Sequence, residues 1–65
     1  MRYYTYVLIE RHYYAASKNR PAGFKKICST IECMAENNAH LFEKIFQSHD
    51  VEKVESITII NVEDV

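Results

Sequence analysis

The order of apolar and polar residues along the chain predicts two strands. Residues 3–9, Tyr-Tyr-Thr-Tyr-Val-Leu-Ile, are aromatic and β-branched and contain no Gly or Pro, a composition typical of strands. Residues 54–62, Val-Glu-Ser-Ile-Thr-Ile-Ile-Asn-Val, predict a second strand in the same way. Residues 12–16 either continue the first strand past a bend or return as a short hairpin partner. Residues 10–12 offer no Gly or Asn for a tight two-residue hairpin turn, but a longer turn is compatible with the sequence, so both alternatives stay open.

The segment 24–48 shows a helical spacing, with apolar residues recurring three and four positions apart. We therefore expect one long helix here. Asn37 and Asn38 interrupt the pattern, and the sequence does not decide whether they kink or break that helix. The preceding residues 17–23 contain the only proline and the only glycine, so they predict a loop. Pro21 suits the first helical position, where a missing N–H costs nothing.

Together these segments predict an α+β fold in the order β-(β)-α-β. A small sheet of two or three strands is packed by one long helix, straight or kinked. At 65 residues the chain is expected to form a single domain over 1–65. The expected core consists of Val7, Ile9, Phe24, Ile27, Ile31, Met34, Phe42, Ile45, Phe46, Ile57 and Ile59.

Both predicted strands are apolar on both faces, whereas one helix can cover only one face of a sheet. A second apolar face is uncommon on a monomer, so we expect a homodimer, a protein partner or both. The homodimer would form by packing faces or by joining sheet edges. The expected interaction face carries aromatic anchors on the first strand: Tyr4, Tyr6 and Leu8.

The net charge of −1 hides a strong asymmetry. Residues 1–26 carry six basic side chains and one acidic side chain, whereas residues 27–65 carry two basic and eight acidic ones. All five tyrosines lie in the basic half, and such a mixture can stack bases and neutralise phosphates. Lysines near a predicted helix start oppose the positive end of the helix dipole, so they also indicate an anion-binding site there. The candidate nucleic-acid or anion site comprises Arg11, Tyr13, Tyr14, Lys18, Arg20, Lys25 and Lys26.

The acidic half allows an opposite interpretation. Its carboxylates could occupy the basic groove of a nucleic-acid enzyme, as an inhibitor would. In size and layout alone, the chain is comparable to small accessory proteins of phages and mobile elements, without any motif to support the analogy. The candidate acidic surface comprises Glu36, Glu43 and Glu52.

No pattern predicts catalysis, a metal or a cofactor. Cys28 and Cys33 form no C-x2-C pair, and the three histidines form no H-x3-H pair. Cys, Ser and His residues are present, but their spacing does not single out a nucleophile with a neighbouring general base. A chain of this length is also too short to enclose a typical pocket for a small-molecule substrate. No apolar run is long enough to span a membrane. Free cysteines suit a reducing compartment, so we expect a cytoplasmic protein.

The sequence therefore predicts a non-enzymatic binding or regulatory module that acts by protein–protein interaction as a homodimer. The first alternative is a nucleic-acid-binding protein that uses its basic, tyrosine-rich half. The second alternative is the acidic inhibitor of phage or mobile-element type. Phosphate binding should weaken steeply as the salt concentration rises, whereas apolar docking on a protein should not. The acidic inhibitor should lose its function when the charges of Glu36, Glu43 and Glu52 are reversed, and it should not need Arg20 or Lys25.

Overall fold

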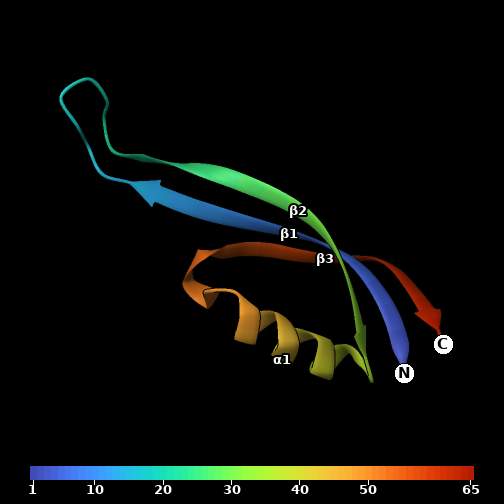
Figure 1. Cartoon of the computed structure of the whole chain (residues 1–65). Helices are drawn as coiled ribbons and strands as arrows, with labels where there is room; N and C mark the ends of the chain where they lie inside the picture. Colours follow the sequence, from blue (N-terminus) through green and yellow to red (C-terminus); the bar gives the residue numbers. More distant parts are fainter.

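A computed structural model describes all residues from Met1 to Val65 as one antiparallel sheet with a short helix on one face (Figure 1). The strands are β1 (Arg2–Tyr14), β2 (Gly23–Ala35) and β3 (Val54–Asp64), arranged in the order β2-β1-β3. Helix α1 (Asn38–Ser48) and the single 3-10 turn η1 (Val51–Lys53) connect β2 to β3. The order along the chain is thus β-β-α-β.

The predicted long helix over 24–48 is wrong, and the predicted fold is corrected accordingly. Residues 24–35 belong to β2, and the helix has only 11 residues. β2 is rich in residues such as Ile27, Thr30 and Ile31 that favour strands, and it pairs with β1 at every position from Tyr14↔Gly23 to Arg2↔Ala35. The apolar residues of this segment fit both a helix and a strand. Pairing with β1 makes the segment a strand.

The two asparagines neither kink nor break a helix; they begin one. Asn37 is the N-cap of α1, and its side chain accepts a hydrogen bond from the backbone N–H of His40 at 2.9 Å. Asn38 is the first helical residue. An asparagine cap satisfies one of the N–H groups that every helix start leaves unpaired, so the helix begins where β2 ends.

The strands predicted over 3–9 and 54–62 are present and are longer than expected. Residues 12–14 continue β1, and the second strand of the chain is β2 rather than 12–16. The predicted loop is confirmed in its centre, where the backbone N–H of Ser17 donates to the carbonyl of Arg20 at 2.8 Å. Pro21 lies in this loop and does not begin a helix.

The core lies between the sheet and α1. Alternate side chains of β1 point toward the helix, and they pack with Leu41 and Ile45, which lie one turn apart on α1. Ile31, Phe42, Ile57 and Ile59 are partly buried around this centre, as the sequence led us to expect of core residues. The fully buried cluster consists of Tyr4, Tyr6, Leu8, Ala35, Leu41 and Ile45.

The interaction face predicted on the first strand is therefore corrected. Tyr4 and Leu8 are 0% exposed and Tyr6 is 4% exposed, so none of them can contact a partner. The helix covers this face, and Val7 and Ile9 lie on the open one instead, where they are half-buried. Because both faces of the strand are apolar, the sequence alone does not choose between them. Other expected core residues are exposed, namely Phe24, Ile27, Met34 and Phe46.

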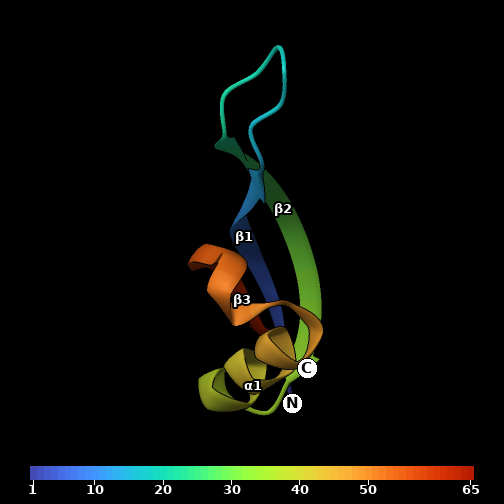
Figure 2. The same ribbon diagram turned by 90° about the vertical axis from the view of Figure 1, so that its left-hand side faces the viewer.

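The molecule is long and thin, with extents of 53 × 18 × 12 Å. β3 pairs with β1 only as far as Glu10, so the rest of the β1–β2 hairpin has no third strand. We call residues 11–26 the hairpin arm and the remaining residues the body. Figure 2 shows the hairpin arm projecting away from α1 and from the rest of the sheet.

Candidate nucleic-acid interface

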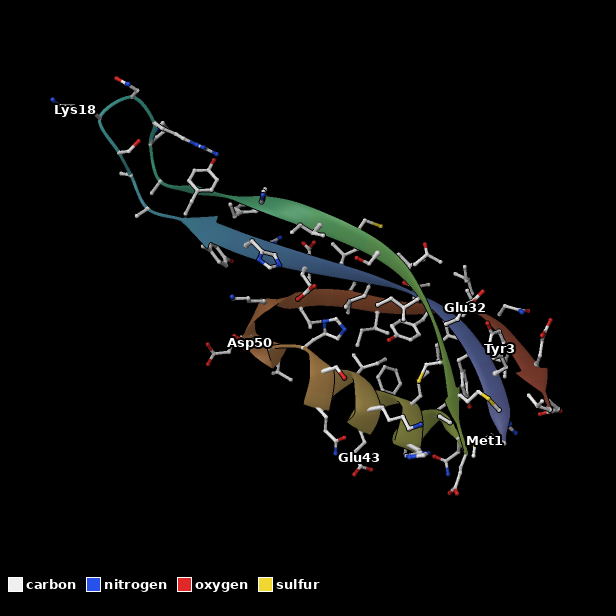
Figure 3. All side chains as sticks on the ribbon, in the orientation of Figure 1. Met1, Tyr3, Lys18, Glu32, Glu43 and Asp50 are labelled. Carbon is white, nitrogen blue, oxygen red and sulfur yellow. The ribbon has the colours of Figure 1, made fainter.

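The hairpin arm brings together every residue of the predicted nucleic-acid site. The arm carries five basic side chains and no Asp or Glu, whereas the body carries three basic and nine acidic ones. Figure 3 shows Lys18 at the tip of the arm, far from the labelled Glu43 on α1. The residues gathered on the arm are Arg11, Tyr13, Tyr14, Lys18, Arg20, Lys25 and Lys26.

One face of the arm presents two adjacent aromatic rings. Tyr13 and Phe24 are directly opposite each other in the β1–β2 register, with ring centroids 5.7 Å apart and planes tilted by 54°. The guanidinium of Arg11 lies 4.7 Å from the centroid of Phe24. The Tyr13 side chain is largely exposed, and Phe24 is also exposed. This face thus offers open aromatic surface beside a cation.

The opposite face of the arm holds a second pair of a cation and an aromatic ring. The guanidinium of Arg20 lies 4.0 Å from the ring centroid of Tyr14. The Tyr14 ring in turn lies across Gly23, and a Cβ atom on that residue would come within 2.7 Å of the Tyr14 hydroxyl. Glycine at this position therefore permits the close approach that seats Tyr14 between the loop and the strand.

At the base of the arm, Glu55 of β3 binds two of the cations. Its carboxylate accepts a hydrogen bond from Nε of Arg11 at 3.0 Å and lies 3.2 Å from Nζ of Lys26. The hydrogen bond from Arg11, helped by Lys26, holds the pKa of Glu55 below its usual value, and the same bond raises the pKa of Arg11. The other three cations of the arm, Lys18, Arg20 and Lys25, have no carboxylate partner.

Three contributors to this site were missed by reasoning from the sequence. Phe24, Gly23 and Glu55 each depend on the strand pairing, because Phe24 faces Tyr13, Gly23 faces Tyr14, and Glu55 lies on β3 next to the base of the arm. Reading residues 23–35 as the hairpin partner of β1 would have found the first two. The predicted anion site at a helix start is wrong, because Lys25 and Lys26 lie on β2 and no helix begins near them.

The candidate acidic surface lies on the other side of the molecule. Glu36 precedes α1, Glu43 lies on it and Glu52 is in η1, and all three are exposed. They are therefore spread along the helix layer. Figure 3 shows Glu43 directed away from the sheet. None of these three carboxylates makes an ion pair.

Two histidines flank a carboxylate where the arm meets the body. Oε2 of Glu10 lies 3.8 Å from Nε2 of His12, and Oε1 lies 3.7 Å from Nδ1 of His49. No group of three or more His, Cys, Asp or Glu side chains is placed to hold a metal ion. A half-open hollow of about 370 Å³ lies between β2 and α1, with Cys33 and Lys44 among its lining residues. Neither feature has the cations and rings of the arm.

No helix is long and apolar enough to cross a membrane. No protein-family model, no curated protein and no solved structure matches this chain.

Proposed function

We propose that this protein is a non-enzymatic module that binds nucleic acid through its hairpin arm. One observation carries the proposal: five cations and three aromatic rings lie on a projecting hairpin that contains no carboxylate. Most of the affinity of such sites comes from neutralising phosphates, and exposed aromatic rings add stacking on bases.

The five cations of the arm differ in whether they already have a carboxylate partner. Lys18, Arg20 and Lys25 have no carboxylate partner, so they are free to contact phosphates. Arg11 and Lys26 already bind Glu55, and a phosphate would have to compete with that carboxylate. We therefore assign the main phosphate contacts to the tip and the outer strand of the arm.

The exposed rings favour a strand with unpaired bases over a closed duplex. Tyr13 is 66% exposed and Phe24 is 44% exposed, and both are on one face of the arm. A base can stack on such a ring only where its own face is free, which is the case in single strands, loops and bulges. The arm is thus expected to bind single-stranded nucleic acid more tightly than duplex.

The burial of Tyr4, Tyr6 and Leu8 removes the anchors on which a protein–protein function rested. The acidic surface has exposed carboxylates, but its residues are spread along the helix layer. The hairpin arm is the surface where charge and aromatic rings coincide, and this supports nucleic-acid binding over the other two interpretations.

Fluorescence anisotropy with a labelled single-stranded oligonucleotide tests the phosphate contacts. The triple variant Lys18→Ala, Arg20→Ala, Lys25→Ala should bind weakly. Its plot of log affinity against log salt should be shallower by about two units, at roughly 0.7 per phosphate contact. Lys53→Ala, which removes a cation from η1 in the body, is the matched control and should bind like the wild type. Equal weakening by both variants, or by neither, would contradict the proposal.

Tyr13→Ala tests stacking separately from charge. The variant should lose about 1–3 kcal/mol of binding energy toward the oligonucleotide, as expected for one stacked base. It should bind dextran sulfate, a polyanion without bases, as well as the wild type does. If both ligands bind Tyr13→Ala normally, the arm is only a polyanion site and the preference for bases is wrong.

A further inference from the structure

The outer edge of β2 is a long unpaired strand edge. β2 has β1 as its only neighbour and pairs with it without a register shift, whereas the pairing of β3 with β1 contains two shifts. Figure 2 shows β2 along the free margin of the sheet. One edge group has a side-chain donor: the carbonyl of Met34 accepts a hydrogen bond from Nζ of Lys44 at 2.7 Å. A regular edge of this length is a template for pairing with another strand.

The sequence of β2 is complementary to itself when it is read in the opposite direction. Consider two copies of β2 that are antiparallel, with a twofold axis beside Ser29. On the open face, Phe24 then lies opposite Met34 of the partner subunit, and Lys26 lies opposite Glu32 of the partner subunit. On the helix face, Ile27 lies opposite Ile31 of the partner subunit. Each of these three pairs occurs twice, and each joins apolar to apolar or basic to acidic. Among the remaining pairs, Lys25 with Cys33 and Cys28 with Thr30 bring no like charges together.

Neighbouring registers lose this complementarity. Moving the axis by one residue in either direction places Lys26 opposite Thr30 or opposite Met34 of the partner subunit, and leaves Glu32 without a cation. The carboxylate of Glu32 is held on the open face, where it accepts a hydrogen bond from the hydroxyl of Tyr3 (Figure 3). The two apolar pairs and the charge pair, for which Lys26 exchanges Glu55 for Glu32 of the partner subunit, therefore favour this register over its two neighbours.

We infer that this chain forms a homodimer through the β2 edges, in the register that centres on Ser29. The result is one continuous sheet of six antiparallel strands in the order β3-β1-β2-β2-β1-β3, with both helices on the same face. The loop of each hairpin arm then lies beside Glu36 of the partner subunit. Edge pairing places Met34 of the partner subunit beside Phe24, but it leaves Tyr13 and the loop cations Lys18 and Arg20 without a partner strand, so the inference does not depend on the proposed nucleic-acid binding.

Exchange of charges across the edge tests the inference with light scattering. The wild type should have a mass about twice that of one 7.7 kDa chain. Glu32→Lys places like charges opposite each other in its own homodimer, and so does Lys26→Glu, so each variant alone should be a monomer. An equal mixture of the two should regain the dimer, because every lysine then meets a glutamate. A wild type that is monomeric, or two variants that each dimerise alone, would overturn the inference.

Cysteine crosslinking tests the register without changing any charge. In a background of Cys28→Ser and Cys33→Ser, Ser29→Cys should form an intermolecular disulfide under mild oxidation, because the twofold axis brings the two thiols together. Thr30→Cys in the same background, and native Cys28 in Cys33→Ser alone, are the matched controls and should crosslink poorly. Crosslinking that is strongest at 28 or 30 would overturn the register. The triple variant of the arm should crosslink at position 29 like the wild-type arm.

Discussion

The hydroxyl of Tyr4 donates a hydrogen bond to Oδ1 of Asn38 at 2.9 Å, and this bond joins the central strand to the first residue of α1. Tyr4 is fully buried, so its ring fills the core while its hydroxyl reaches the helix start at the margin of that core. Buried tyrosines usually find such a partner. The sheet therefore fixes the place where the helix begins.

Tyr4→Phe should lower the free energy of unfolding by about 1 kcal/mol, the net contribution of a typical hydrogen bond. The ring stays in the core, so only the bond to Asn38 is lost. Urea denaturation followed by circular dichroism measures the change. Tyr13→Phe removes a hydroxyl from an exposed ring and should leave the midpoint unchanged. Equal midpoints for both variants would show that the bond contributes nothing.

Leu41→Ala should destabilise the fold by about 2–5 kcal/mol, because it empties a fully buried position between α1 and the sheet. For a chain this small, that loss approaches the total stability. Phe46→Ala lies on the same helix at a side chain that is 44% exposed, and it should cost clearly less. Thermal denaturation compares the two. A larger loss for Phe46→Ala would mean that the helix presents its other face to the sheet.

Asn37→Ala should cost about 1 kcal/mol, because the backbone N–H of His40 loses the side-chain oxygen that caps the helix. Asn19→Ala, in the loop of the hairpin arm, is the matched control and should be neutral. The readout is the urea midpoint together with the helical signal at low temperature. An unchanged helix in Asn37→Ala would contradict the assignment of the cap.

Glu55→Gln should make stability less dependent on pH on the acid side. The pKa of Glu55 is lowered in the folded state, chiefly by its hydrogen bond from Arg11. A group with a depressed pKa adds stability above its unfolded pKa, near 4.5, and that stability is lost as the pH falls through the lower folded value. Melting temperatures from neutral pH to pH 3 should therefore differ most at neutral pH and converge in acid.

The same variant links stability to binding. Glu55→Gln frees Arg11 and Lys26 from their carboxylate, so the oligonucleotide should bind more tightly at neutral pH even though the fold is less stable. Glu43→Gln, on α1 and without an ion-pair partner, is the control and should change neither property. Weaker binding by Glu55→Gln would mean that the carboxylate orients the two cations for their ligand.

Strands were predictable from the sequence where composition alone decides, as in 3–9 and 54–62. The segment 24–35 was not. Phe24, Ile27 and Ile31 recur three and four positions apart, as in a helix, but the same residues also fit a strand that is apolar on both faces. Only pairing with β1, a contact distant in sequence, separates the two. The choice of core face failed for the same reason, because Val7 and Leu8 are equally apolar and the position of α1 decides which is buried.

The basic residues of the candidate site were predictable because they are close together in the sequence, and a hairpin keeps such residues together in space. The partners Phe24 and Glu55 were not, since each becomes a neighbour only through the register of a particular strand pair. Local composition therefore indicated the chemistry of the site, and the sheet supplied its geometry.

The separation of charge along the 53 Å axis gives each single chain a large electric dipole moment. In the field of a polyanion the acidic body is repelled and the basic arm is attracted, so a single chain experiences a torque that turns its arm forward before contact. In the antiparallel dimer the twofold axis cancels the components of the two dipole moments that lie in the plane of the sheet. The dimer is therefore not turned in this way, and it can meet a polyanion with either of its two basic ends.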